Sequence, residues 1–81
     1  MTDKKSLTDL VDELVNVRYE LEKMKYSQPD RRHGWITAAY VLSYGLDSGL
    51  GKRQIADVLQ KRINETMQEM SDLSAKVEVT N

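Results

Sequence analysis

Residues 34–46 read GWITAAYVLSYGL, and none of these side chains carries a charge. In a chain of 81 residues, 31% of them charged, so long an uncharged run is unusual. It contains no proline and is long enough for several helical turns. The run therefore predicts a helix that is covered on more than one side.

Three stripes of side chains appear when this run is wound at about 100° per residue. The main apolar stripe, which we expect to face the core, consists of Trp35, Ala39, Leu42 and Leu46. A neighbouring stripe, small enough for another helix backbone to come close, consists of Gly34, Ala38, Val41 and Gly45. The stripe opposite the first consists of His33, Ile36, Tyr40 and Tyr44. One short chain cannot easily cover this last stripe.

The surplus apolar side chains predict a dimer or partner interface. Its residues would be Trp35, Ile36, Tyr40 and Tyr44, because Trp and Tyr are residue types that anchor interfaces. Two other interpretations stay open. The tyrosines can be ordinary half-buried residues with a packed ring and a hydrated hydroxyl group, or they can line a small-molecule pocket.

The segments on either side carry heptad-like apolar patterns. The first pattern is Leu7, Leu10, Leu14, Val17, Leu21 and Met24. The second pattern is Ala56, Leu59, Ile63, Thr66, Met70, Leu73 and Val77. Spacings that alternate between three and four residues predict amphipathic helices. The fold class is therefore all-α, with two long heptad-patterned helices flanking a short apolar central helix.

Turn-forming residues set the expected helix boundaries within a single domain over residues 1–81. Ser6, followed three residues later by Asp9, resembles a capping box and predicts a first helix over about 7–26. Pro29 breaks the pattern before a second helix over about 30–46, and Gly45 either lies inside that helix or ends it. The glycine-rich turn around residues 47–51 precedes a third helix over about 52–75, with a frayed tail at 77–81.

The unequal helix lengths also predict association. A middle helix of about 25 Å cannot cover neighbours of roughly 30 and 36 Å. Either the outer helices pair antiparallel beyond it, or a second subunit covers them. Thr66 in the second pattern, with Met24, Met67 and Met70, indicates an adaptable interface rather than a rigid zipper.

No constellation of residues predicts an enzyme, a metal site or a cofactor. His33 is the only histidine, cysteine is absent, and no carboxylate follows His33 at helical spacing. The glycines match neither a phosphate loop nor a dinucleotide-binding motif. We therefore expect no catalytic, metal or cofactor residues.

Charge is unevenly distributed although the net charge is only −1. Both ends of the sequence are acidic and its middle is basic. With antiparallel outer helices, a basic docking end would collect Arg31, Arg32, His33, Lys52 and Arg53. Such an end would meet an acidic protein or nucleic-acid phosphate, and the pI of about 5.8 favours the protein.

Residues 51–59, GKRQIADVL, resemble the first helix of a helix-turn-helix unit. The resemblance ends there, because Gln60, Lys61 and Arg62 stand where the turn would need a small and then an apolar residue. We expect the third helix to continue instead.

Location follows from the ends and the composition. The first residues lack the apolar run of a signal peptide, and the uncharged run is too short to cross a bilayer. Without cysteine, the chain suits a reducing compartment. We expect a cytoplasmic protein without a membrane partner.

The sequence as a whole predicts a small non-enzymatic regulatory or adaptor protein, of a size that suits bacterial or phage modulators. Its partners would be a second copy of itself, as a homodimer, and another protein. One alternative is a nucleic-acid-binding regulator that uses the basic end. A second alternative is a coiled-coil protein of structural or assembly function.

Overall fold

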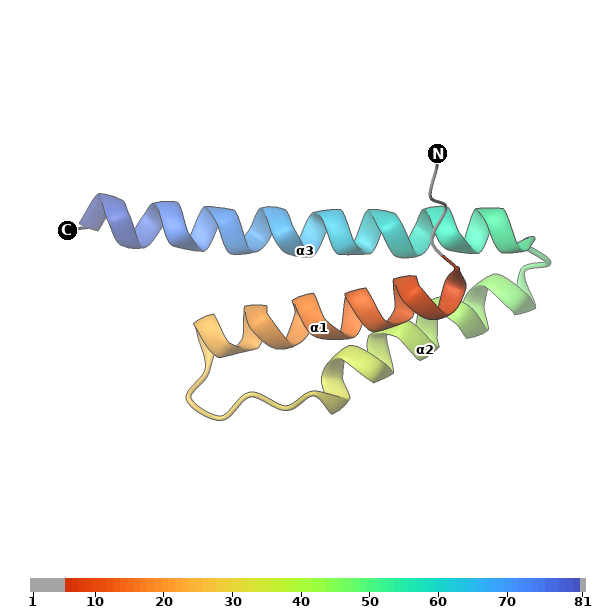
Figure 1. Cartoon of the computed structure of the whole chain (residues 1–81), viewed down its shortest axis with the longest axis horizontal. Helices are drawn as coiled ribbons and strands as arrows, with labels where there is room; N and C mark the ends of the chain where they lie inside the picture. Colours follow the sequence, from red (N-terminus) through yellow and green to blue (C-terminus); the bar gives the residue numbers. More distant parts are fainter. Residues whose placement is uncertain (1–5, 81) are drawn as a thin grey trace.

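Leucine, valine and isoleucine at helical spacing build the core of three packed helices (Figure 1). The computed structural model describes the backbone of residues 6–80 and the side chains of residues 6–76. Its helices are α1 (Leu7–Lys25), α2 (Arg32–Asp47) and α3 (Lys52–Thr80). Over residues 6–80 there is no strand, so the predicted all-α class is confirmed.

The chain reverses direction at each connection, so α1 and α3 run parallel and α2 runs opposite to both (Figure 1). An ion pair marks this arrangement, because Lys25 Nζ at the end of α1 lies 3.3 Å from Glu69 Oε2, well along α3. The expectation of antiparallel outer helices is therefore wrong. Two short reversals in succession return the chain to its first direction.

Local capping explains where the helices begin and end. Ser6 Oγ accepts a hydrogen bond from the backbone N–H of Asp9 at 3.1 Å, as the sequence predicts. After α2, the N–H of Gly49 donates to the carbonyl of Leu46, and the N–H of Leu50 donates to the carbonyl of Gly45. This Schellman pattern needs a left-handed residue, and Gly49 supplies it with a φ of 77°. Gly45 thus lies inside α2.

The third helix is longer than the sequence predicts. It continues to Thr80 instead of ending near residue 75, so a tail that frays from residue 77 is not observed over 77–80. No glycine or proline follows Gly51, and nothing local stops the helix. Position 81 lies outside the described residues. The helix also passes through Gln60–Arg62 without a turn, as expected.

The core lies where all three helices meet. Its buried members are Leu10, Val11, Leu14, Val15, Ala38, Val41, Ile55, Leu59 and Ile63. In α2, the buried side is the small-residue stripe, which includes Ala38 and Val41 and not Trp35 or Leu46. The expectation that the Trp35 stripe faces the core is therefore wrong.

The close approach of α2 to its neighbours explains why its small-residue stripe is the buried one. A Cβ on Gly34 would stand 2.9 Å from the Cα of Val15 and 3.0 Å from its carbonyl oxygen. A Cβ on Gly45 would stand 2.7 Å from Cγ1 of Ile55. Residues of this size let α2 lie against α1 and α3, and larger side chains such as that of Trp35 do not fit there.

The long α3 projects beyond the end of α1. With 29 residues against 19, and about 1.5 Å per residue, α3 is roughly 15 Å longer than α1. The elongated shape, 47 × 31 × 19 Å, follows from this difference. Within the described part of the chain, no helix combines the length and apolar character needed to traverse a bilayer.

Candidate functional site

The outer side of α2 exposes five large apolar side chains. Their exposed fractions are 50% for Trp35, 64% for Ile36, 65% for Tyr40, 61% for Tyr44 and 69% for Leu46. We call these five residues the α2 face. The sequence predicted four of them as an interface, and the structure brings all four together on one helix. Leu46 was expected in the core instead.

Side chains one turn apart form the edges of the α2 face. The rings of Tyr40 and Tyr44 stack, with centroids 6.5 Å apart and planes inclined by 16°. This is the contact expected between aromatic residues at i and i+4. Trp35 lies toward the other edge, and small Ala39 and Ser43 are exposed between the edges.

The exposure of the α2 face follows from what α2 buries. Gly34, Ala38, Val41 and Gly45 share one side of the helix, toward α1 and α3. Because these four positions lie on one side, the large residues between them must point away from it. A helix with apolar residues on both sides is typical of a segment buried in a larger assembly.

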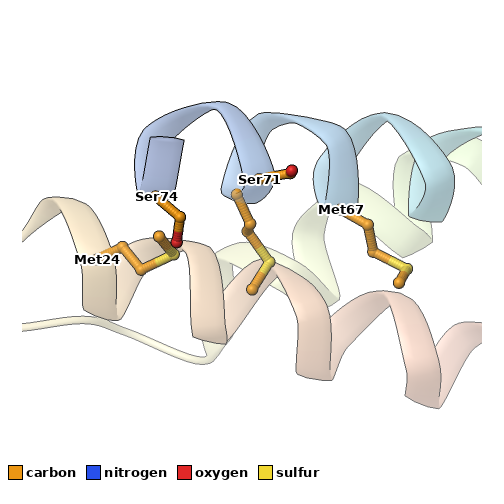
Figure 2. A pocket seen from close by; sticks show the side chains of 5 residues that line it. Met24, Met67, Ser71 and Ser74 are labelled. Atoms are coloured by element: carbon orange, nitrogen blue, oxygen red, sulfur yellow. The ribbon is translucent and has the colours of Figure 1, made fainter. Parts of the chain in front are cut away.

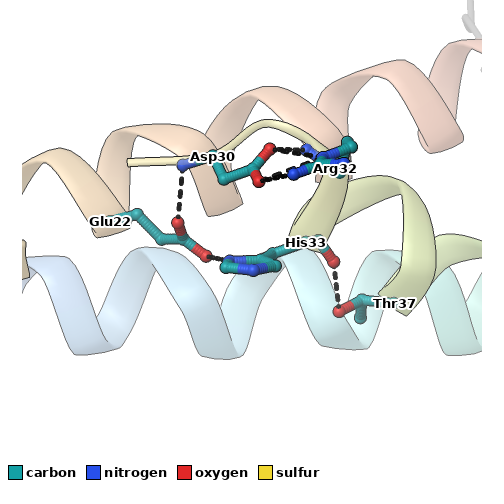
Figure 3. A network of polar contacts seen from close by, with 5 residues as sticks. All are labelled: Glu22, Asp30, Arg32, His33 and Thr37. Carbon is teal, nitrogen blue, oxygen red and sulfur yellow. Dashed lines mark hydrogen bonds and ion pairs between the residues drawn. The ribbon is translucent and has the colours of Figure 1, made fainter. Parts of the chain in front are cut away.

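A network of polar contacts holds the start of α2 against the end of α1 (Figure 3). The buried carboxylate of Glu22 accepts a hydrogen bond from the backbone N–H of Asp30 at 3.0 Å. Its other oxygen lies 2.6 Å from Nδ1 of His33. Arg32 binds the carboxylate of Asp30 through Nε and Nη2, the latter at 2.8 Å. These contacts therefore fix the start of α2, and with it the first residues of the α2 face, relative to α1.

Electrostatics in this network favour the charged carboxylates. The hydrogen bond from the Asp30 N–H, with further help from His33 and Arg18, lowers the pKa of Glu22. Hydrogen bonds from the Arg32 side chain and backbone lower the pKa of Asp30 to about 2. Both groups are therefore ionised at neutral pH.

The sequence did not identify Glu22 as a buried anchor, although it held a signal. Val11, Val15, Arg18 and Glu22 continue one spacing of three and four along the side of α1 that meets α2. The heptad-like pattern predicted for this helix runs through other positions and does not include this stripe.

The five residues of the expected basic end do not come together. Arg31, Arg32 and His33 lie at the start of α2, whereas Lys52 and Arg53 lie at the start of α3, beyond the opposite end of α2 (Figure 1). All three residues of the first group are also engaged within the chain, and His33 contacts Glu22. Arg31 Nη2 donates to Asn16 Oδ1 at 2.7 Å, and Arg32 binds Asp30. The parallel course of α1 and α3 separates the two basic groups.

A second apolar surface lies where α3 passes the end of α1. Met24, Met67, Met70, Ser71 and Ser74 line a shallow open groove of about 270 Å³ (Figure 2). The thioether side chains lie between the two helices, and both serines come from α3. We call it the methionine groove. It contains no residue of α2 and is separate from the α2 face.

Among the described residues, no group of three or more His, Cys, Asp or Glu side chains is placed to hold a metal ion. Comparison of the chain with protein-family models, curated proteins and solved structures found no match. The α2 face and the methionine groove are two exposed apolar surfaces that the described part of the chain offers to a partner.

Proposed function

We propose that this chain is a small non-enzymatic regulatory or adaptor protein that acts by binding another protein, with a homodimer as its working form. One observation carries the proposal: α2 holds five large apolar residues on its outer side, all at least half exposed. Monomeric proteins rarely expose apolar patches of more than a few hundred Å². A protein that covers the α2 face would remove the unfavourable contact between these apolar side chains and water.

The chemistry of the α2 face suits a protein partner. Trp and Tyr are enriched among the residues that dominate interface energetics. The Tyr40–Tyr44 stack presents two rings whose hydroxyl groups can stay hydrated at the rim of an interface. The fixed start of α2 means that little order has to be created when a partner binds.

The methionine groove supports an adaptor more than a simple dimer. Methionine side chains adapt to partners of different shape. Because the groove is lined by α1 and α3 alone, a dimer through the α2 face and a second protein in the groove would use different residues. A chain without cysteine suits the cytoplasm, where we place it.

The α2 face can be tested in the native host by photo-cross-linking. We expect p-benzoylphenylalanine in place of Tyr44 to give a discrete adduct with protein, either a second copy or another chain. The same probe in place of Lys61, an exposed residue of α3, is the control and should give little adduct. Equal labelling at the two positions, or none at Tyr44, would contradict the proposal.

The double substitution Tyr40→Ala with Tyr44→Ala should weaken association at least tenfold, since interface aromatic residues each contribute about 1–2 kcal/mol or more. Both rings are exposed in the isolated chain, so its helicity should stay near that of the wild type. Circular dichroism checks the fold, and light scattering checks association. Unchanged association would show that the two tyrosines are ordinary surface residues that do not contribute to the interface.

Neither alternative function gains a specific observation. A nucleic-acid-binding regulator would need a concentrated basic surface, and Arg31–His33 lie apart from Lys52 and Arg53. A coiled-coil assembly protein would leave heptad seams for other chains. In this chain, α1 and α3 pack the apolar residues of these seams against each other as far as Ile63.

A further inference from the structure

The charged residues of the outer side of α2 lie only at its two ends and have opposite signs. Arg32 stands one turn before Ile36, and Asp47 stands one turn after Ser43. Residues four apart lie on the same side of a helix, so both charges border the α2 face. Between them the helix has no Asp, Glu, Lys or Arg.

We infer that the partner of the α2 face is a second copy of this chain, with the two α2 helices antiparallel and their two-fold axis between residues 39 and 40. This rests on the proposed function and names the protein that covers this surface. In that arrangement Arg32 lies level with the partner's Asp47, and Asp47 lies level with the partner's Arg32. The α2 face is self-complementary in this orientation only, because parallel helices would place like charges together.

Arg32 can serve its own chain and its partner at once. It holds Asp30 through Nε and Nη2, yet its side chain is 84% exposed. A guanidinium group has five N–H donors, which leaves donors for a second carboxylate. The contact with Asp30 also fixes where the charge of Arg32 is presented.

The middle of the α2 face combines small and bulky side chains, so those of two copies can interdigitate across the axis. The two-fold axis passes beside Ala39, and Ser43 lies one turn further on. These residues are small and exposed, and the bulky exposed side chains of Ile36 and Tyr40 lie beside them. Side chains of Tyr40 from the two copies then meet near the axis.

The available area is sufficient for a dimer. With aromatic side chains of about 150–250 Å² each, the α2 face exposes roughly 700 Å² per copy. Two copies would hide up to about 1,400 Å², within the range of specific protein interfaces. A monomer would leave an unusually large apolar patch in water.

Charge exchange tests the pairing. Arg32→Asp alone, or Asp47→Arg alone, places like charges together at both ends and should raise the dimer Kd about tenfold. The chain carrying both substitutions should bind more tightly than either single variant, although it lacks the Arg32–Asp30 contact of the wild type. Sedimentation equilibrium on the purified chain measures all four proteins. A double variant that binds no more tightly than the single variants, with helicity intact, would overturn the antiparallel pairing.

Disulfide trapping tests the register without altering any charge, because the chain has no cysteine. The arrangement places Ile36 level with the partner's Ser43. In a mixture of the Ile36→Cys and Ser43→Cys variants, disulfides should therefore join one copy of each variant in preference to two copies of the same variant. A preference for disulfides within each variant would indicate parallel helices and overturn the inference.

The outcomes also separate this inference from the proposed function. If the purified wild type is monomeric up to millimolar concentration while the Tyr44 probe captures a different protein in the host, self-pairing and the homodimeric working form are wrong, and the proposed binding of another protein stands. If the probe captures no protein, both are wrong.

Discussion

Glu22 positions α2 because one buried carboxylate holds two groups at the junction with α1. It accepts the backbone N–H of Asp30 and lies within hydrogen-bonding distance of His33, three residues later. Asp30 in turn binds Arg32, the residue with which α2 begins. These contacts orient the first turn of α2, from which Trp35 and Ile36 project.

Glu22→Gln tests the charge of this anchor while keeping its shape. Since the folded state lowers the pKa of Glu22 from 4.5, the ionised group stabilises the fold above pH 4.5, and this contribution is lost as pH falls. The variant should therefore unfold at lower urea concentration than wild type at neutral pH. The difference should shrink progressively below pH 4.5. Urea unfolding over a pH series measures it.

Asp57→Asn makes the same loss of one charge at an exposed position of α3 and is the matched control. The loss of stability in Glu22→Gln, measured against wild type, could instead stay constant from neutral to strongly acidic pH. That result would show that the lost interaction does not depend on the charge of the Glu22 carboxylate.

At the scale of the helix, the packing of α2 is governed by the size of its residues more than by their hydrophobicity. Gly34 meets the backbone of α1, and Gly45 meets the side chain of Ile55. As a consequence, α2 buries its small residues and exposes its aromatic residues. The large residues of the α2 face are exposed because α1 and α3 lie too close to the other side of α2 to accommodate them.

Gly34→Ala should lower the free energy of unfolding by about 1–2 kcal/mol. Alanine in place of glycine gains about 1 kcal/mol in helix propensity, but overpacking costs about 1–3 kcal/mol. The cost should be in the upper part of that range, because the new Cβ meets the backbone of Val15, which cannot rotate away. Chemical denaturation measures the net effect.

Ser43→Ala is the control for this substitution. It introduces the same residue into the same helix at an exposed position and should be neutral or slightly stabilising. If Gly34→Ala stabilises the chain as Ser43→Ala does, the close contact between α1 and α2 is not tight in solution.

The existence of α2 and its three stripes could be predicted from residues 34–46, because periodicity depends only on the order of residues. Which stripe is buried could not be predicted, because that depends on the distance between helix backbones. A hydrophobicity ranking chooses Trp35 and Leu46, and both are exposed. The side chains of Ile36, Tyr40 and Tyr44 are exposed, and their role in an interface stays a prediction. The buried role of Glu22 depends on a contact with a later segment and was missed.

On the scale of the whole molecule, direction along the bundle determines which charges meet. The basic middle of the sequence is divided by α2, since its two connections lie at opposite ends of that helix. Helix content alone does not reveal this. The separation weakens the case for a nucleic-acid surface and leaves two apolar regions, the α2 face and the methionine groove, as candidate surfaces for the proposed protein contact.

Trp35 reports on the α2 face directly, because it is the only tryptophan in the chain and is half exposed. If a second copy covers the α2 face as proposed, the fluorescence emission of Trp35 should move to shorter wavelength as protein concentration rises. The variant Ile36→Glu places a charge near the middle of this surface and should keep the long-wavelength emission at every concentration, with unchanged helicity. Wild-type emission that does not change with concentration, and matches that of Ile36→Glu, would contradict the pairing of α2 with a second copy.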